Sequence, residues 1–192
     1  NLNKFNEVKN AKTFANPMVE DVFELGSIMK PLTMAVGIDT GVVSKDSTYY
    51  DQGCLTLDKK KICNYDGKAR GTVPMQEVLS QSLNVGATYV ALKVGNVKFS
   101  EYFKSLGFGE ETGIDLPNEV HGLISNLDSK RDIEMATASY GQGIALTPVE
   151  MVRALSTLAN GGRLITPHVV TKIEYDTGLS KKIAYDDGNI AI

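Results

Sequence analysis

The chain has 192 residues, of which 42% are hydrophobic and 22% are charged. This composition is typical of a soluble globular protein that buries one sizeable core, and we find no internal repeat or second domain. The formal net charge is -3, and the sequence shows no clustered basic face. That pattern argues against nucleic-acid binding and gives no reason to expect adhesion to anionic lipid.

Residues 1–21 are rich in Asn and Lys and contain few large apolar side chains. We expect them to form an approach segment with little core of its own. The sequence has no initiator methionine, no signal peptide and no apolar run long enough to span a bilayer.

A serine and a lysine lie three residues apart at the start of the first predicted helix, in Ser27-Ile28-Met29-Lys30. This spacing places the hydroxyl and the amine on one helix face. Gly26 permits a sharp turn into the helix. A serine becomes a nucleophile when a base removes its proton, and a lysine does this only when its pKa is lowered. The pattern indicates an acyl-transfer site; the alternative is a capped surface helix with Lys30 in solvent.

The two cysteines flank a predicted hairpin. If residues 55–62 turn at Asp58-Lys59, Cys54 faces Cys63 in a non-hydrogen-bonded pair, whose close approach suits a disulfide. Such a bond would fit an oxidising exterior. A one-residue change in register would separate the sulfurs, so the disulfide is one of two outcomes. We expect Lys59 to Lys61 to form a solvated turn, and no metal site is implied.

Ser82 and Asn84 follow a short helix predicted over about residues 74–81. In the turn after it, the Ser82 hydroxyl could relay a proton and the Asn84 amide could hold a substrate carbonyl. Alternatively, Asn84 caps the next helix, which we expect to begin near Val85. The apolar face of that helix carries Ala87, Val90, Ala91 and Val94.

The second half of the chain contains further helices and one hairpin. Phe99, Phe103 and Leu106 predict a core helix that stops at Gly107. Residues 108–129 are rich in Gly, Asp, Pro and Asn, which predicts a long connection. Thr147-Pro148-Val149-Glu150 is a capping box for a helix that ends at Gly161-Gly162. Two strands, at 169–175 and 179–184, are predicted to pair as a hairpin.

Two interpretations remain open for Tyr140-Gly141-Gln142-Gly143-Ile144. The glycines could permit a tight turn before the capped helix, or Gly141, Gln142 and Gly143 could line the cleft and bind substrate. His121 and His168 are scattered, and nothing near them indicates a catalytic triad.

At this point the sequence resembles a known family. Residues 24–31 are similar to the serine motif of penicillin-binding proteins, the D,D-transpeptidases that cross-link peptidoglycan, and residues 77–86 are similar to their second motif. An ordered series is far more specific than a single motif. The match runs from about Phe23 to Val170, and its later segments, in the order typical of class B members, are residues 140–144, 146–151, 159–162 and 167–170.

The resemblance implies an α+β fold of the penicillin-binding protein and serine β-lactamase type. One departure is that the family's third motif, Lys-(Thr/Ser)-Gly, has no counterpart, because Asp39-Thr40-Gly41 and Asp176-Thr177-Gly178 carry aspartate instead of lysine. We therefore expect residues 1–192 to form one partial transpeptidase domain, with a helical subdomain and part of the antiparallel sheet. Its family core would be residues 22–170, and a hairpin at 165–185 would lead toward the missing strand.

The resemblance also implies a mechanism without metal or cofactor. Ser27 would attack the carbonyl between two terminal D-alanines of a peptidoglycan stem peptide, Lys30 would take its proton, and Ser82 would pass a proton toward the departing amine. β-Lactams would be trapped at Ser27. Because one oxyanion donor would come from the missing strand, we expect the fragment alone to be inactive or nearly so.

By resemblance, the protein would act at the extracytoplasmic face of the bacterial cell membrane, in cell division, cell shape or sporulation. An N-terminal helix absent from this chain would anchor it, and other cell-wall synthesis proteins would be partners. Two alternatives remain open. A serine β-lactamase or β-lactam sensor would share Ser27 and Lys30, and a non-catalytic relative would serve as a cell-wall scaffold.

Overall fold

The structure is a computed structural model that describes residues 7, 15–185 and 188–192. Most of the described body is helical. The α-helices are α1 (Pro17–Glu20), α2 (Lys30–Asp39), α3 (Met75–Ser80), α4 (Asn84–Val94), α5 (Asn96–Ser105), α6 (Asp132–Ala138) and α7 (Pro148–Ser156). The shorter 3-10 turns are η3 (Gly26–Met29), η4 (Ser125–Asp128) and η5 (Thr157–Ala159).

The described strands pair only as antiparallel two-stranded ribbons, namely β1–β4, β2–β3, β5–β8 and β6–β7. Together with the helices they confirm the predicted α+β class. The strands are β1 (Thr48–Asp51), β2 (Cys54–Leu57), β3 (Lys60–Cys63), β4 (Gly71–Pro74), β5 (Arg163–Leu164), β6 (Lys172–Glu174), β7 (Ser180–Lys182) and β8 (Asn189–Ile190).

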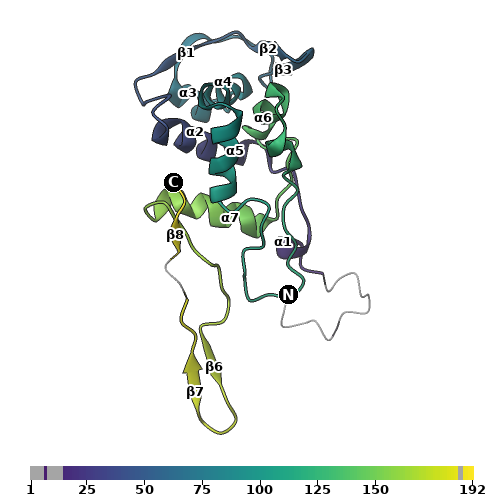
Figure 1. The fold of residues 1–192 in the computed structure, drawn as a ribbon, viewed down its shortest axis with the longest axis vertical. Coiled ribbons are helices and arrows are strands. Elements are labelled where there is room, and N and C mark those ends of the chain that lie inside the picture. Colours follow the sequence, from purple (N-terminus) through teal and green to yellow (C-terminus); the bar gives the residue numbers. More distant parts are fainter. Residues whose placement is uncertain (1–6, 8–14, 186–187) are drawn as a thin grey trace.

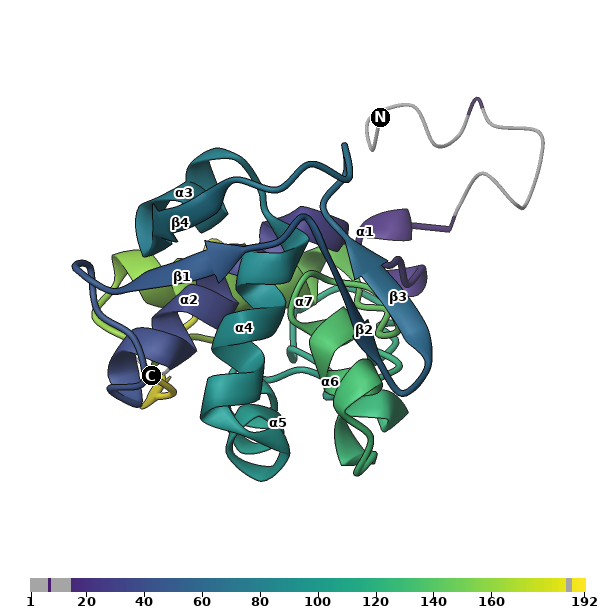
Figure 2. The same cartoon turned by 90° about the horizontal axis from the view of Figure 1, so that it is seen from above.

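Helix α4 lies in the middle of the helical body and packs against both α2 and α6 (Figure 2). The ribbons β1–β4 and β2–β3 lie over one end of this body, and α7 lies near the other end (Figure 1). The β6–β7 hairpin projects away beyond α7, and the residues of both its strands are exposed.

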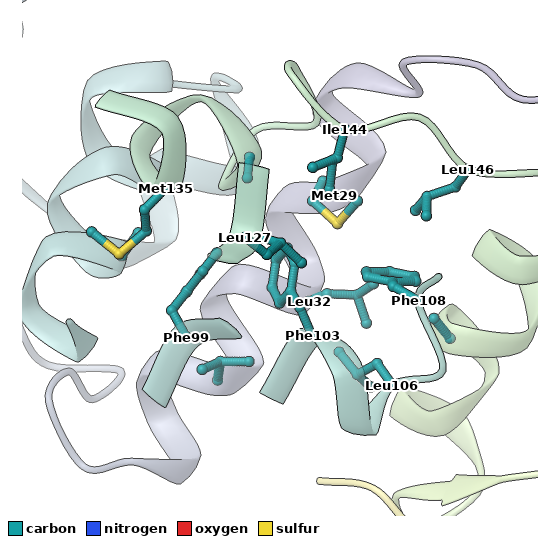
Figure 3. Close-up of a cluster of buried hydrophobic side chains, with 14 of the residues drawn as sticks. Met29, Leu32, Phe99, Phe103, Leu106, Phe108, Leu127, Met135, Ile144 and Leu146 are labelled. Carbon is teal, nitrogen blue, oxygen red and sulfur yellow. The ribbon is translucent and has the colours of Figure 1, made fainter. Parts of the chain in front are cut away.

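The larger hydrophobic cluster joins α2, α5, α6 and α7 (Figure 3). The ring centroids of Phe99 and Phe103, one turn apart on α5, are separated by 4.1 Å, and Phe108 packs edge-on against Phe103 at 5.4 Å. Aromatic pairs in this range contribute about 0.5–1.5 kcal/mol beyond the burial of their area. Met29 and Leu32 of the first helical turns point into the same cluster. Burial of Met29, between Ser27 and Lys30, therefore anchors the polar turn to the core.

Several predicted elements are confirmed with changed limits. Helix α5 carries Phe99 and Phe103, and Thr147 caps α7 through the predicted capping box. The helix does not run unbroken to Gly161, because it tightens into η5 after Ser156. The predicted hairpin at 169–184 forms, but its paired strands are only β6 and β7.

The β2–β3 hairpin has the predicted register, with Cys54 opposite Cys63 and their Cα atoms 4.0 Å apart, and a disulfide joins the two residues. The prediction that Lys59 to Lys61 form a turn is correct only for Lys59. Asp58 and Lys59 occupy the turn at φ 45° and 66°, whereas Lys60 and Lys61 pair with β2 as part of β3.

Of the predicted approach segment, residues 1–6 and 8–14 lie outside the described residues. Its described part forms α1, which Asn16 caps by accepting a hydrogen bond from the N–H of Met18. Val19 is fully buried, so this helix contributes one side chain to the packed interior.

Candidate active site

The candidate nucleophile lies on a tight turn that glycine permits. Gly26 has φ +64°, a left-handed conformation that costs glycine little. The Gly26 N–H donates to the carbonyl of Gly141 over 3.1 Å. The 3-10 turn η3 follows and leads directly into α2, with Pro31 in its first turn. As a result Ser27 is exposed at the surface while Lys30 is buried.

Lys30 occupies the centre of the polar cluster. Its Nζ atom lies 3.0 Å from Oγ of Ser27, 2.9 Å from Oγ of Ser82 and 2.7 Å from the Ser82 carbonyl oxygen. The residue is 2% exposed. Among the described residues no carboxylate forms an ion pair with it. Burial lowers its pKa from 10.5 to about 8. The alternative of a solvated lysine on a capped surface helix is therefore wrong.

Ser82 presents two oxygens to Lys30 because its backbone is left-handed. It follows α3 and has φ +54°, and its N–H donates to the carbonyl of Leu79 over 3.3 Å. A non-glycine residue in this region costs about 1–3 kcal/mol and persists where the surroundings hold it. This conformation points both the hydroxyl and the carbonyl of Ser82 at the same amine.

Asn84 does not cap the following helix, so that alternative is wrong. It is the first residue of α4, and its Nδ2 donates to the carbonyl of Cys63 over 2.9 Å. The cap comes from elsewhere, because Oδ1 of Asn64 accepts from the N–H of Val85 over 3.1 Å. Within the described residues, the amide oxygen of Asn84 has no hydrogen-bond partner, and it remains available to a ligand.

The segment 140–144 folds as a tight turn against the nucleophile turn. Gly141 has φ +79°, and a Cβ there would lie 2.2 Å from the Gly26 carbonyl oxygen. Gly143 has φ +74°, and its N–H donates to Oε1 of Glu24 over 2.8 Å. The turn interpretation therefore holds for both glycines. Gln142 between them is exposed, and binding of substrate by Gly141, Gln142 and Gly143 stays a prediction.

A buried hydrogen-bond network that the sequence did not indicate supports the Ser82–Asn84 turn. Nδ2 of Asn64 donates to both carboxylate oxygens of Asp51, over 3.0 and 2.9 Å, and the Gly53 N–H donates to the same carboxylate. Both side chains are almost fully buried. Asp51, Gly53 and Asn64 flank the β2–β3 hairpin, but the sequence does not show that Asn64 also reaches Val85 at the start of α4.

The chemistry available at this site is acyl transfer. The exposed hydroxyl of Ser27 and the hydroxyl of Ser82 both lie within hydrogen-bonding distance of the buried amine of Lys30. The Asn84 amide is two residues from Ser82 along the chain. Neither of the histidines is among these groups. Across residues 7, 15–185 and 188–192, no cluster of His, Cys, Asp and Glu could hold a metal ion. The same residues contain no helix with the length and apolarity needed to cross a bilayer.

The sequence is similar to known proteins along nearly all of its length. The family description that matches residues 1–189 is that of the penicillin binding protein transpeptidase domain. Stage V sporulation protein D of Bacillus subtilis is 32% identical over 177 residues, covering 92% of this chain and 27% of that protein. A peptidoglycan D,D-transpeptidase FtsI homolog of Mesostigma viride is 30% identical over 168 residues, covering 82% of this chain and 28% of that protein.

The fold is similar to a solved structure as well. Penicillin binding protein 3 of Mycobacterium tuberculosis, complexed with aztreonam, has a TM-score of 0.85 at 23% identity, covering 100% of this chain and 42% of that one. The chain spans only 27–28% of the length of the two curated relatives. From the family match over residues 1–189, we conclude that this chain belongs to the penicillin-binding protein transpeptidase domain family.

Proposed function

We propose that this chain carries the catalytic serine of a peptidoglycan D,D-transpeptidase, with residues 22–170 as its family core. One observation supports this most strongly: the buried Nζ of Lys30 lies within hydrogen-bonding distance of both Ser27 and Ser82. The names of the relatives, which include peptidoglycan D,D-transpeptidases, support the same reaction.

In the proposed reaction, neutral Lys30 takes the proton of Ser27 as its Oγ attacks the carbonyl between two D-alanines of a stem peptide. The C–N bond breaks, and a proton reaches the departing amine through Ser82. This leaves an ester on Ser27. The amine of a second stem peptide then attacks that ester, forms the cross-linking amide and releases Ser27. Asn84 would hold a substrate carbonyl through its remaining amide N–H. Gln142, which is exposed on the turn that packs against Gly26, would also contact the substrate.

We further propose that β-lactams acylate Ser27. Attack on the lactam carbonyl opens the ring, and because both parts stay attached, the whole drug mass is added to the protein. A place at the extracytoplasmic face of the bacterial cell membrane is consistent with the Cys54–Cys63 disulfide, since such bonds persist in oxidising compartments.

The test is a prolonged incubation of the chain with a penicillin, followed by intact mass measurement. Acylation is a single event, so a prolonged incubation detects it even if the missing oxyanion donor slows it about a hundredfold or more. We expect one adduct of the full penicillin mass, absent in Ser27→Ala. Thr40→Ala is the control, because it removes a hydroxyl at the residue that follows the end of α2, outside the site, and should leave the adduct intact. A folded chain without any adduct would contradict the proposal.

A further inference from the structure

A cleft of about 350 Å³ opens between strand β3 and helix α6, next to the candidate active site. The two elements lie side by side in both views of the fold (Figures 1 and 2). The chemistry-bearing residues that line the cleft are Lys60, Lys61, Arg131, Glu134, Tyr140 and Gln142.

The charge of this cleft is positive because its lysines are not neutralised. Arg131 donates to Oε1 of Glu134 over 3.2 Å, and its Nε lies 3.9 Å from Oδ2 of Asp58. These carboxylates therefore already compensate the guanidinium. The side chains of Lys60 and Lys61, both exposed, form no ion pair or hydrogen bond with any described residue. Two ammonium groups beside one cleft favour an anionic ligand.

Tyr140 adds a hydrogen-bond donor to the wall of this cleft. Its side chain packs in the second hydrophobic cluster and is only 6% exposed. The hydroxyl forms no hydrogen bond with a described residue and is accessible to solvent at the wall of the cleft. Burial also raises the pKa of Tyr140, so the group remains a donor at neutral pH. A ligand oxygen in the cleft would satisfy this donor.

The cleft continues directly from the two edges of the candidate active site. On one side, Ile62 lines the cleft, and the next residue, Cys63, accepts the hydrogen bond of Asn84. On the other side, Gln142 lines it and follows Gly141, which accepts the hydrogen bond of Gly26. The cleft therefore adjoins both the strand that holds Asn84 and the turn that packs against Gly26, the residue before Ser27.

We propose that this cleft binds a side carboxylate of the peptide substrate, held by Lys60 and Lys61 with the Tyr140 hydroxyl as a donor. The ligand class is an acidic peptide, since the cleft adjoins the site where a peptide bond would be attacked. This inference rests on the proposed transpeptidase function. It identifies Lys60 and Lys61 as residues that determine specificity for charge near the reacting bond.

The test uses two fluorescent peptides that end in D-Ala-D-Ala and differ only in one acidic residue, which is free in one and amidated in the other. Binding is measured by anisotropy with the Ser27→Ala chain, so that no peptide is consumed. We expect the free carboxylate to bind about threefold to tenfold more tightly. The preference should disappear in a Lys60→Gln, Lys61→Gln double variant, shrink in Tyr140→Phe, and decrease as the ionic strength rises.

Lys59→Gln is the matched control, because it removes the same charge from the same hairpin but at a position that does not line the cleft. It should keep the preference. Equal binding of the two peptides, an equal loss in Lys59→Gln, or no detectable binding of either peptide would overturn the inference. Displacement of the acidic peptide by inorganic phosphate at matching affinity would also overturn it, in favour of a phosphate ligand.

Failure of this inference is distinguishable from failure of the proposed function. The penicillin adduct is measured in parallel on the wild-type chain and on Lys59→Gln. If the adduct forms at Ser27 without any carboxylate preference, only the cleft assignment is wrong. If a folded wild-type chain forms no adduct, the transpeptidase proposal itself is wrong.

Discussion

The N–H of Gly26 donates a 3.1 Å hydrogen bond to the carbonyl of Gly141, which joins the turn before the candidate nucleophile to a segment far along the chain. The contact is so close that a Cβ on Gly141 would lie 2.2 Å from the Gly26 carbonyl oxygen. The position of Ser27 therefore depends on how closely Gly141 packs against Gly26, the residue that precedes it.

We expect Gly141→Ala to slow acylation of Ser27 by a penicillin at least about tenfold, because small displacements of reacting groups have large effects on rate. Gly161→Ala is the control. Gly161 also has a left-handed backbone, at φ +78°, but no atom lies within 4 Å of the position of its Cβ. Both variants place a Cβ on a left-handed backbone and incur the cost of that conformation. Only Gly141→Ala also displaces the turn that precedes Ser27. Equal acylation rates, followed by intact mass over time, would contradict this prediction.

The second prediction concerns Lys30 as the base. Lys30→Met keeps a side chain of similar length but removes the amine, and we expect acylation to fall by about 10²–10⁴. Since burial lowers the pKa of Lys30 to about 8, and only the neutral amine accepts a proton, the wild-type rate should rise with pH through about 8 and then level off. Acylation rates, followed by intact mass in quenched samples between about pH 6 and about pH 10, measure this dependence. A wild-type profile as flat as that of Lys30→Met would exclude Lys30 as the base.

The lowered pKa of Lys30 also affects stability. Between about 8 and the ordinary value of 10.5 the unfolded chain binds more protons at this site than the folded chain does. The free energy of unfolding should therefore increase with pH across that window, and this increase should be smaller in Lys30→Met. Urea unfolding at several pH values compares the two slopes.

The next prediction concerns the buried network of Asp51 and Asn64 that supports the Ser82–Asn84 turn. Asn64→Leu removes both hydrogen bonds that Nδ2 donates to the Asp51 carboxylate, which is 0% exposed, and also removes the cap at Val85. We expect a loss of about 2–4 kcal/mol in the free energy of unfolding. Gln52→Leu, an exposed neighbour, should change it by less than about 0.5 kcal/mol. Urea unfolding that gives both variants the same stability would show that the network contributes little.

The last prediction concerns the Cys54–Cys63 disulfide. Replacing both cysteines with serine should lower the free energy of unfolding by about 2–3 kcal/mol, from the loop that the bond closes. It should also slow acylation, because the disulfide fixes the strand whose backbone carbonyl at residue 63 accepts the hydrogen bond from Asn84. Thermal unfolding with and without a reductant checks the first part. The reductant should lower Tm of the wild-type chain and leave Tm of the variant unchanged.

Much of the site could be predicted because its residues are close in sequence. The spacing of Ser27 and Lys30 across one helical turn places both on the same side of the chain, and the hairpin register follows from counting outward from Asp58-Lys59. The role of Lys30 needed more than spacing. Its burial depends on packing against α3 and α4, and no pattern within the serine motif reveals that packing.

The rest of the site could not be predicted because long-range contacts decide it. The expected cap at Asn84 was wrong, since Asn64 reaches the start of α4 through the fold and leaves Asn84 to bond with Cys63. The tight turn at Gly141 could be expected from its glycines, but the surface on which it packs could not. The solvated turn expected at Lys59 to Lys61 includes only Lys59, because the hairpin that turns at Asp58-Lys59 pairs Lys60 and Lys61 with β2.

The exposed position of the β6–β7 hairpin determines where local unfolding should occur first among the described strands. Its strands are exposed throughout, and its hydrogen bonds lie outside both hydrophobic clusters. A two-stranded ribbon of this kind is only marginally stable in water by itself. Its amides should therefore exchange with solvent through local fraying, whereas those of α4 exchange only when the buried body opens as a unit. Within the described residues, the turns of the candidate active site therefore lie apart from this labile hairpin.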